Sequence, residues 1–382
     1  MYQIPYGKQE ITAEDKAAVL QTLDHDFLTQ GPRIAEFEAA FAEYVGATHA
    51  VAVANGTAAL HLCALALGVG PDTHVITSPI TFAASANCIR YCGGHIHFAD
   101  IDPNTGLLDI HAVEDLLRSH PEGFFSGIIP VDFAGLSVDM QAFRVLADRY
   151  GLWIIEDACH APGATFTDAQ GHTQRAGSGV YADLAIFSFH PVKHIACGEG
   201  GMITTRKLEL YQRLQLLRTH GITKDPQQMT HNDGTWYYQM QTLGYNYRLS
   251  DIQAALGISQ LQRAQTNLSR RHAIAERYAE AFQEMPHIKP LTPFSTQHAY
   301  HLYVVLTEER KALYDHLRSE GIFAQVHYIP VHQMPYYVEQ YGDQTGRFPN
   351  AERYYAQCLS LPMYPSLRRE EQDYVLAVIK NL

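Results

Sequence analysis

Several features are scarce in this sequence of 382 residues. Its six cysteines are too few for a disulfide scaffold. No uninterrupted apolar run reaches the roughly 18 residues that are needed to span a bilayer. Residues 1–6 show no basic region followed by an apolar run, which a signal peptide would have. We therefore expect a cytoplasmic protein with reduced, mostly buried thiols and no contact with a membrane.

Positive charge is also scarce. The chain has 28 lysines and arginines against 40 acidic residues, which gives a formal net charge of -12. Such a surface repels phosphate backbones, so we expect no nucleic-acid partner. A local cluster of donors could still bind an anionic small molecule.

Two common motifs are missing. A dinucleotide fingerprint should open the first helix, but Gly68-Val69-Gly70 closes a predicted helix instead. This argues against a nicotinamide-linked dehydrogenase. Asp157, Cys159 and His160 fit no common zinc spacing, so no metal is expected.

What the sequence does contain is a regular alternation of apolar strands and helices. The predicted strands cover residues 49–54, 75–78, 96–99, 127–131, 152–156, 184–188 and 202–204. Helices are predicted at 57–67, 81–91 and 140–150. This order predicts a mostly parallel sheet covered by helices, with ligands at the carboxyl ends of its strands.

The pattern changes after Ser250. Long helices are predicted at 251–265 and 268–282. They are followed by strands at 301–306 and 322–328, a helix between them at 308–320, and a last helix at 370–380. We expect a large domain over residues 12–260 and a smaller C-terminal α/β domain over 261–382, which residues 1–11 complete.

Two clusters at predicted strand ends suit a charged ligand. Asn55-Gly56-Thr57-Ala58 forms a glycine turn that runs into a helix, an arrangement that binds phosphate but also serves as an ordinary cap. Glu156-Asp157 ends a hydrophobic strand, where carboxylates are costly unless something positive meets them. A helix cap or a surface loop is the alternative there.

Two further clusters follow. Lys193 lies in an apolar and glycine-rich run, and burial lowers the pKa of a lysine and makes its amine a nucleophile for Schiff-base chemistry. A solvated loop lysine is the alternative. Residues 244–251 are aromatic and polar and could form a ligand loop or a hinge. Together, a phosphate cradle, a carboxylate and a lysine suit a pyridine cofactor with a phosphate tail.

The order and spacing of these motifs resemble a known family. Residues 29–32, 55–57, 156–158, 188–190 and 244–248 are similar to the DegT/DnrJ/EryC1/StrS nucleotide-sugar aminotransferases, which are fold type I pyridoxal-phosphate (PLP) enzymes. The resemblance covers nearly the whole chain. It implies an aspartate-aminotransferase-like α/β fold, with a three-layer large domain around a mostly parallel sheet and a smaller C-terminal α/β domain.

The resemblance also implies roles for single residues. Lys193 would be the catalytic lysine that holds the cofactor as a Schiff base. Asp157 would pair with the pyridinium nitrogen, so that the ring can act as an electron sink. His160 would lie near the phenolic oxygen, where many relatives have glutamine, and Phe82 would stack on the ring.

The phosphate and the assembly follow from the same resemblance. Thr57, Ala58 and Ser188 would hold the phosphate, and Asn246 would reach over from a neighbouring subunit. A homodimer with shared active sites is therefore expected, with pyridoxamine phosphate as the form of the cofactor that carries the amino group.

Dehydratase relatives carry histidine in place of the cofactor lysine, and His194 stands beside Lys193. The match through residues 188–192 places lysine at that position, which favours transamination. A PLP-binding regulator without turnover remains an alternative.

Residues 4–7, 26–32 and 326–332 resemble most the members that act on a UDP-linked 4-keto-6-deoxy-L-sugar with L-glutamate as donor and 2-oxoglutarate as co-product. Family members acting on another nucleotide-linked 4-keto sugar are the alternative. Tyr6, His327, Tyr328 and His332 would line the sugar pocket, although ordinary packing between domains explains them as well.

Overall fold

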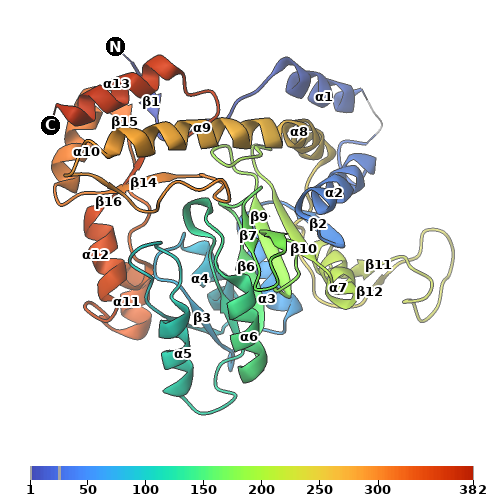
Figure 1. Ribbon diagram of the computed structural model, residues 1–382. Coiled ribbons are helices and arrows are strands. Elements are labelled where there is room, and N and C mark those ends of the chain that lie inside the picture. Colours follow the sequence, from blue (N-terminus) through green and yellow to red (C-terminus); the bar gives the residue numbers. More distant parts are fainter. Residues whose placement is uncertain (1, 25–26, 382) are drawn as a thin grey trace.

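A seven-stranded sheet with helices packed around it forms the centre of the protein (Figure 1). The computed structural model describes residues 2–24 and 27–381. Asp26, part of one segment that carries the resemblance, lies outside the described residues. In order across the sheet, the strands are β2 (His49–Val53), β10 (Gly201–Thr205), β9 (Leu184–Ser188), β6 (Trp153–Asp157), β5 (Gly127–Ile129), β3 (His74–Thr77) and β4 (His95–Phe98).

The sheet is mostly parallel, as predicted. Its exception is β10, which runs antiparallel to both β2 and β9. Gly201 pairs with Val53 on one side and with Ser188 on the other. The carboxyl ends of β2, β9 and β6 therefore lie at one edge of the sheet, where β10 begins.

Several helices before residue 250 begin or end at capping residues that the sequence contains. These helices are α1 (Ala13–Leu23), α2 (Pro32–Val45), α3 (Gly56–Ala66), α4 (Ala84–Tyr91), α5 (Ile110–Arg118), α6 (Met140–Tyr150) and α7 (Leu208–Arg218). Thr12 and Asp15 form a capping box at the start of α1. Helix α2 ends at Gly46 with a φ of 77°, a left-handed conformation that glycine adopts without strain.

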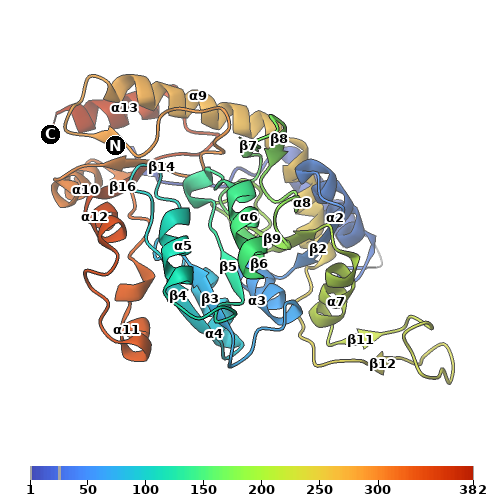
Figure 2. The same cartoon turned by 60° about the horizontal axis from the view of Figure 1, so that its bottom comes forward.

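A second group of elements follows. Its helices are α8 (Asp251–Gln262), α9 (Ala264–Phe282), α10 (Arg310–Ser319), α11 (Pro335–Tyr341), α12 (Pro349–Gln357) and α13 (Arg369–Lys380). Its strands are β13 (Lys289–Pro290), β14 (Tyr303–Leu306), β16 (Cys358–Leu361), and the pair β1 (Ile4–Pro5) and β15 (Ile322–Phe323). Both chain ends lie beside this group in Figures 1 and 2.

This second group has a hydrophobic cluster of its own. Ile4, Tyr278, Val305 and Leu361 are buried together in it, so β1 contributes to it from the far end of the chain. The division into residues 12–260 and 261–382 with 1–11 stays a prediction, and its boundary falls in the last turn of α8.

Three differences from the sequence prediction stand out. Helix α4 begins at Ala84 rather than Thr81, and the Thr81 hydroxyl instead lies within hydrogen-bond distance of the Ser85 hydroxyl inside the site. The strand predicted at 322–328 is only two residues long, since its partner β1 is equally short. Two hairpins, β7–β8 (Thr165–Thr167 and Thr173–Arg175) and β11–β12 (Ile222–Thr223 and Gln239–Met240), were not expected.

Hairpin β11–β12 and its long tip project from the body of the protein in both views (Figures 1 and 2). Among the described residues, no helix has the length and apolar character that crossing a membrane requires.

Candidate active site

Lys193 lies in a loop that leaves the sheet at β9 and returns to it as β10. The loop is tied across its base, because the Phe189 N–H donates to the Gly200 carbonyl at 2.8 Å and the Cys197 N–H to the Phe189 carbonyl at 2.9 Å. Burial lowers the pKa of the Lys193 amine, while Cys159 and Asp157 act in the opposite direction. A larger fraction of the amine is therefore neutral and nucleophilic than in a solvated lysine.

Asp157 ends β6 on the neighbouring strand. Its Oδ2 accepts a hydrogen bond of 2.6 Å from the Ser85 hydroxyl, and its Oδ1 accepts one of 3.2 Å from the Cys159 N–H. Ser85 in turn lies 2.8 Å from the Thr81 hydroxyl. These bonds fix the orientation of a carboxylate that is only 6% exposed.

The N-terminus of α3 lies against the end of β9. Asn55 caps the helix by accepting from the Ala58 N–H at 2.8 Å. A Cβ on Gly56 would lie 2.9 Å from the Cβ of Ser188, so only glycine allows the helix to begin so close to the strand. The positive end of the helix dipole and the Ser188 hydroxyl thus form one anion-binding corner.

His160 is buried beside these groups in a defined tautomer. Its Nδ1 accepts from the Ala134 N–H at 3.2 Å, and a backbone N–H can only donate. The ring proton is therefore on Nε2, which faces the Tyr328 hydroxyl at 3.1 Å. Burial, and next the charge of Lys193, lower the pKa of His160 well below its ordinary value, so the ring is neutral.

Three other histidines surround Lys193 and are neutral for the same reason. Burial lowers the pKa of His194, His301 and His327, with the charge of Lys193 as a further cause in each case. The His194 ring is turned toward the Ala299 carbonyl, to which its Nε2 donates at 2.9 Å. It is therefore not oriented as the cofactor-facing histidine of a dehydratase would be. These four buried histidines therefore place no imidazolium beside the Lys193 amine.

The remaining predicted residues fall into two groups. Tyr6 packs against His327 in a tilted arrangement with ring centroids 5.0 Å apart, and Phe82, 62% exposed, lies 6.2 Å from the Tyr328 ring. A Cβ on Gly7 would lie 3.4 Å from Val192, which places Tyr6 near the lysine loop.

His332 and Asn246 are not brought together with these residues. His332 is 1% exposed, packs on Phe348 at 4.7 Å and bonds Glu352 at 3.3 Å. Asn246 is exposed beyond β2, held there because the Ala54 N–H donates to the Tyr247 carbonyl.

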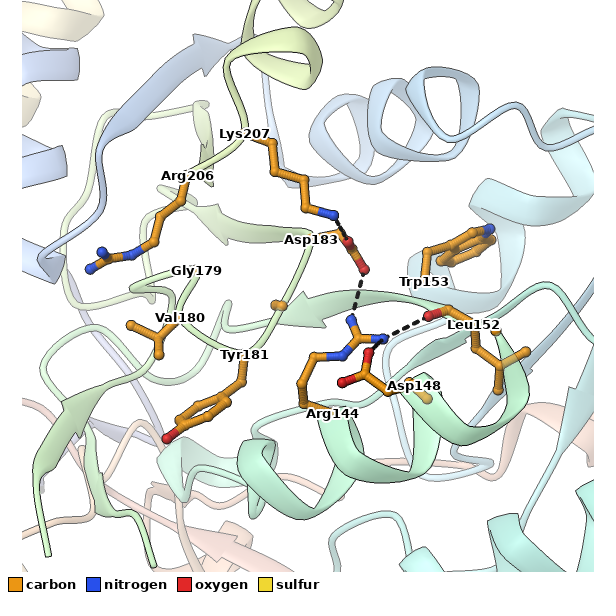
Figure 3. Close-up of a pocket in the computed structure, with 13 residues that line it drawn as sticks. Arg144, Asp148, Leu152, Trp153, Gly179, Val180, Tyr181, Asp183, Arg206 and Lys207 are labelled. Atoms are coloured by element: carbon orange, nitrogen blue, oxygen red, sulfur yellow. Dashed lines mark hydrogen bonds and ion pairs between the residues drawn. The ribbon is translucent and has the colours of Figure 1, made fainter. Parts of the chain in front are cut away.

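A hollow in the surface lies elsewhere, at the opposite edge of the sheet (Figure 3). It measures about 640 Å³ and includes Trp153 at the start of β6. Charged side chains in this hollow pair with one another, since Asp183 accepts from Arg144 at 3.2 Å and also from Lys207. Lys193, Asp157 and the N-terminus of α3 do not line this hollow. They gather at the carboxyl ends of the strands, so we place the active site at those carboxyl ends.

Comparison with known proteins agrees with this geometry. Residues 9–380 match the DegT/DnrJ/EryC1/StrS aminotransferase family. The chain belongs to this family. It is 40% identical to the spore coat polysaccharide biosynthesis protein SpsC of Bacillus subtilis (strain 168), over 99% of this chain and 97% of that protein. It is 36% identical to the UDP-4-amino-4,6-dideoxy-N-acetyl-beta-L-altrosamine transaminase of Campylobacter jejuni, over 97% and 95% respectively.

Solved structures give the same result. PseC of Helicobacter pylori, an aminotransferase involved in the biosynthesis of pseudoaminic acid, superposes with a TM-score of 0.89 at 30% identity, over 100% of this chain and 99% of that one. Spr1654 of Streptococcus pneumoniae in its PLP-form superposes with a TM-score of 0.88 at 30% identity, over 100% and 98%. The family member described here is a PLP-dependent sugar aminotransferase of fold type I, and a nucleotide sugar and an amino donor are its substrates. The family, fold class and cofactor predicted from the sequence are confirmed.

Residues of this structure fit the cofactor. The corner at Gly56 and Ser188 has the glycine and the helix N-terminus that a phosphate needs, and a side chain on Gly56 would fill it. Asp157 is a hydrogen-bonded carboxylate, and Lys193 is an amine with a lowered pKa.

Sequence reasoning missed Ser85, the Ala134 N–H and Asp132. Nothing in the sequence distinguishes Ser85 from other helical serines. Asp132 had a signal, since it follows an apolar strand just as Asp157 does.

Proposed function

We propose that this aminotransferase moves the amino group of L-glutamate to C4 of a UDP-linked 4-keto-6-deoxy-hexose. The proposed acceptor is UDP-2-acetamido-2,6-dideoxy-beta-L-arabino-hexos-4-ulose, and the pathway is pseudaminic acid biosynthesis. The observation that carries the reaction is the convergence of Lys193, Asp157 and the α3 N-terminus at one sheet edge. The names and identities of the Campylobacter and Helicobacter relatives support the acceptor.

Each residue at this edge has a proposed part in holding the cofactor. Asp157 faces the pyridine nitrogen and His160 the phenolic oxygen, to which its Nε2–H can turn from Tyr328. Thr57, Ala58 and Ser188 bind the phosphate. The exposed ring of Phe82 covers one face of the cofactor.

PLP, when bound, supplies the electron sink that makes the Cα proton of glutamate acidic, and it carries the amino group from donor to acceptor. Lys193 Nζ takes that Cα proton, and in the second half-reaction it delivers a proton to C4 of the sugar. A lysine with a lowered pKa suits both duties, because more of its amine is neutral and able to accept a proton than in a solvated lysine.

The sugar is proposed to bind on the side of Tyr6, His327 and Tyr328. Tyr6 and His327 are in contact, and Tyr328 lies between His160 and Phe82. These groups offer aromatic faces and neutral donors, which suit a deoxy sugar. His332 supports them indirectly, because its segment is held where the Val331 N–H donates to the Pro79 carbonyl.

A second acceptor is another nucleotide-linked 4-keto sugar. The 40% identity to SpsC, a protein named for spore coat polysaccharide biosynthesis, favours it.

Spectroscopy of the purified protein tests both half-reactions. Addition of L-glutamate should bleach the visible band of bound PLP, and the proposed UDP-4-keto sugar should restore it. NMR of the product should place nitrogen on C4. If the protein binds PLP but only a different 4-keto sugar restores the band, the second acceptor is the correct one. If glutamate does not alter the band, the amino-transfer proposal is wrong.

We also propose a homodimer with shared active sites, in which Asn246 reaches the partner's phosphate. Hairpin β11–β12 and the segment after it carry four exposed apolar side chains: Trp236 at 72%, Tyr238 at 54%, Met240 at 64% and Leu243 at 75%. Exposed apolar groups on a projecting arm favour a protein interface. Light scattering should give twice the chain mass of 42.8 kDa, and Trp236→Ser with Leu243→Ser should shift it toward the monomer.

A further inference from the structure

Two buried carboxyl groups behind the active site have no part in the reaction described above. Asp132 follows β5 and is 0% exposed, and Glu156 is the last residue but one of β6 and is 3% exposed. The Asp132 N–H donates to the Asp157 carbonyl at 3.0 Å, so both groups are tied to the backbone of the proposed cofactor carboxylate.

The hydrogen bonds of this pair are incomplete if both groups are ionised. Asp132 Oδ1 accepts from the Val138 N–H at 3.0 Å, and Glu156 Oε1 accepts from the Gly177 N–H at 2.9 Å. Asp132 Oδ2 is buried without any donor, although the two carboxyls lie within hydrogen-bonding reach of each other. Two carboxylates can only accept, whereas one protonated carboxyl supplies the missing donor.

Charge leads to the same conclusion. The ionisable group that acts on both carboxyls is Asp157, which is negative when ionised. The nearby Cys159 thiol stays neutral, because burial raises its pKa. Burial likewise raises the pKa of Asp132 well above its usual range and that of Glu156 to about 7.

We infer that Asp132 and Glu156 share one proton, which Asp132 Oδ2 holds and donates to Glu156, and that the pair sets the negative charge behind Asp157. This inference rests on the proposed pairing of Asp157 with the pyridine nitrogen. Asp132 and Glu156 are positioning residues, since they act on the cofactor only through Asp157. When the shared proton leaves for solvent, the pair gains a second negative charge, which strengthens the hold on a positively charged ring.

Two isosteric substitutions isolate this proton. Asp132→Asn replaces the O–H donor by an amide N–H, and Glu156→Gln supplies an amide N–H to Asp132 Oδ2 in place of the shared proton. Each variant keeps one carboxylate and removes the shared proton. A suitable control is Asp168→Asn. Asp168 is a buried carboxylate remote from the site, and hydrogen bonds, chiefly from Gln174, lower its pKa to about 2, so it is ionised.

The first measurement uses the protein without cofactor. Infrared difference spectra at pH 8, where Glu156 is ionised and Asp132 keeps the proton, should contain the C=O stretch of a protonated, buried carboxyl group. That band should be lost in Asp132→Asn and in Glu156→Gln and kept in Asp168→Asn. A wild-type spectrum without the band, or a band that both pair variants retain, would overturn the inference. If Asp132→Asn fails to fold, Glu156→Gln gives the same reading.

The second measurement uses the PLP-loaded enzyme, followed by visible absorption between pH 5.5 and 9. The wild type should show a transition above pH 7, where the pair loses the proton that Asp132 holds, and both pair variants should lack it. A transition unchanged in both variants would overturn the role behind Asp157. Failure of the wild type to bind PLP would instead remove the proposed function, and the infrared result would still decide whether the proton is shared.

Discussion

Lys193 is the residue on which the proposed chemistry depends most. Lys193→Ala should lower turnover by at least about 10³-fold, because the only proposed proton carrier at Cα and C4 is gone. Its melting temperature should stay close to that of the wild type, since among the described residues the amine makes no hydrogen bond or close ion pair whose loss would destabilise the fold, and burial already disfavours its charge. Lys207→Ala, in the distant hollow, is the control and should keep its activity in a coupled assay of 2-oxoglutarate formation.

Ser85 is expected to hold Asp157 ready for the cofactor. Ser85→Ala removes a 2.6 Å hydrogen bond to a buried carboxylate, which is worth about 1.5–3 kcal/mol, so the Kd for PLP should rise roughly tenfold or more. The matched control is Ser259→Ala, which removes a 2.7 Å bond to the buried carboxylate of Asp15. Fluorescence titration with PLP measures both variants, and equal affinities would contradict the assignment.

At the residue scale, the sequence predicts groups that are out of place in their surroundings. Lys193 in a glycine-rich apolar run and Asp157 at the end of a buried strand were found in that way. Ser85 and the Ala134 N–H were not, because their importance comes from the partner that the fold brings to them. Ala134 has a φ of 59°, a conformation that no feature of its sequence demands.

At the scale of elements, α1 is held to α8 through one buried carboxylate. Asp15 is 0% exposed and accepts from Arg263, Gln260 and Ser259. Asp15→Ala should lower the free energy of unfolding by about 3 kcal/mol, since it leaves the partners without their acceptor.

The exposed pair Lys311–Asp315 is the control for this change, because its side chains are 86% and 59% exposed. Asp315→Ala should cost less than about 1 kcal/mol in the same urea titration. A similar loss in both variants would show that the burial of Asp15 contributes nothing.

Elements with a local signal were predicted well. Helix α6 and strand β9 have the bounds that the sequence predicts, because Asp139 and Gly151 cap the helix and the strand is a continuous apolar run. Hairpin β11–β12 was not predicted, and strand β15 was predicted only in part. Their ladders are two residues long and depend on partners that the sequence alone does not identify.

At the scale of the whole molecule, acid should destabilise the protein more than its net charge suggests. Histidines 61, 74, 97, 160, 194, 298, 301, 327 and 332 have pKa values lowered chiefly by burial. Each stays neutral when folded but binds a proton when unfolded below about pH 6.5. The unfolded state therefore binds more protons, and stability falls as the pH drops from about 6.5 toward the folded values.

The histidine cluster at the amino edge of the sheet allows a test. His74 Nδ1 lies 2.9 Å from His97 Nε2, and burial, then His74, lower the pKa of His97 to about 4. His97→Gln should recover about 1–2 kcal/mol of stability at pH 4.5 relative to pH 7.5, allowing for solvent around a half-buried ring. His287→Gln, which changes an exposed histidine, should recover no stability at pH 4.5. Thermal unfolding of both variants at the two pH values tests this difference.

The antiparallel strand β10 also determines the order in which the chain can fold. Strand β2 is synthesised early, yet it pairs in the sheet with β10, whose Gly201 meets Val53. Strand β1 waits longer still, because Ile4 pairs with Ile322. Pairings so distant in sequence form slowly, since a long loop must close before they contribute stability. The edge where PLP binds can therefore be assembled only after most of the chain has left the ribosome, and capture of the cofactor is a late event of folding.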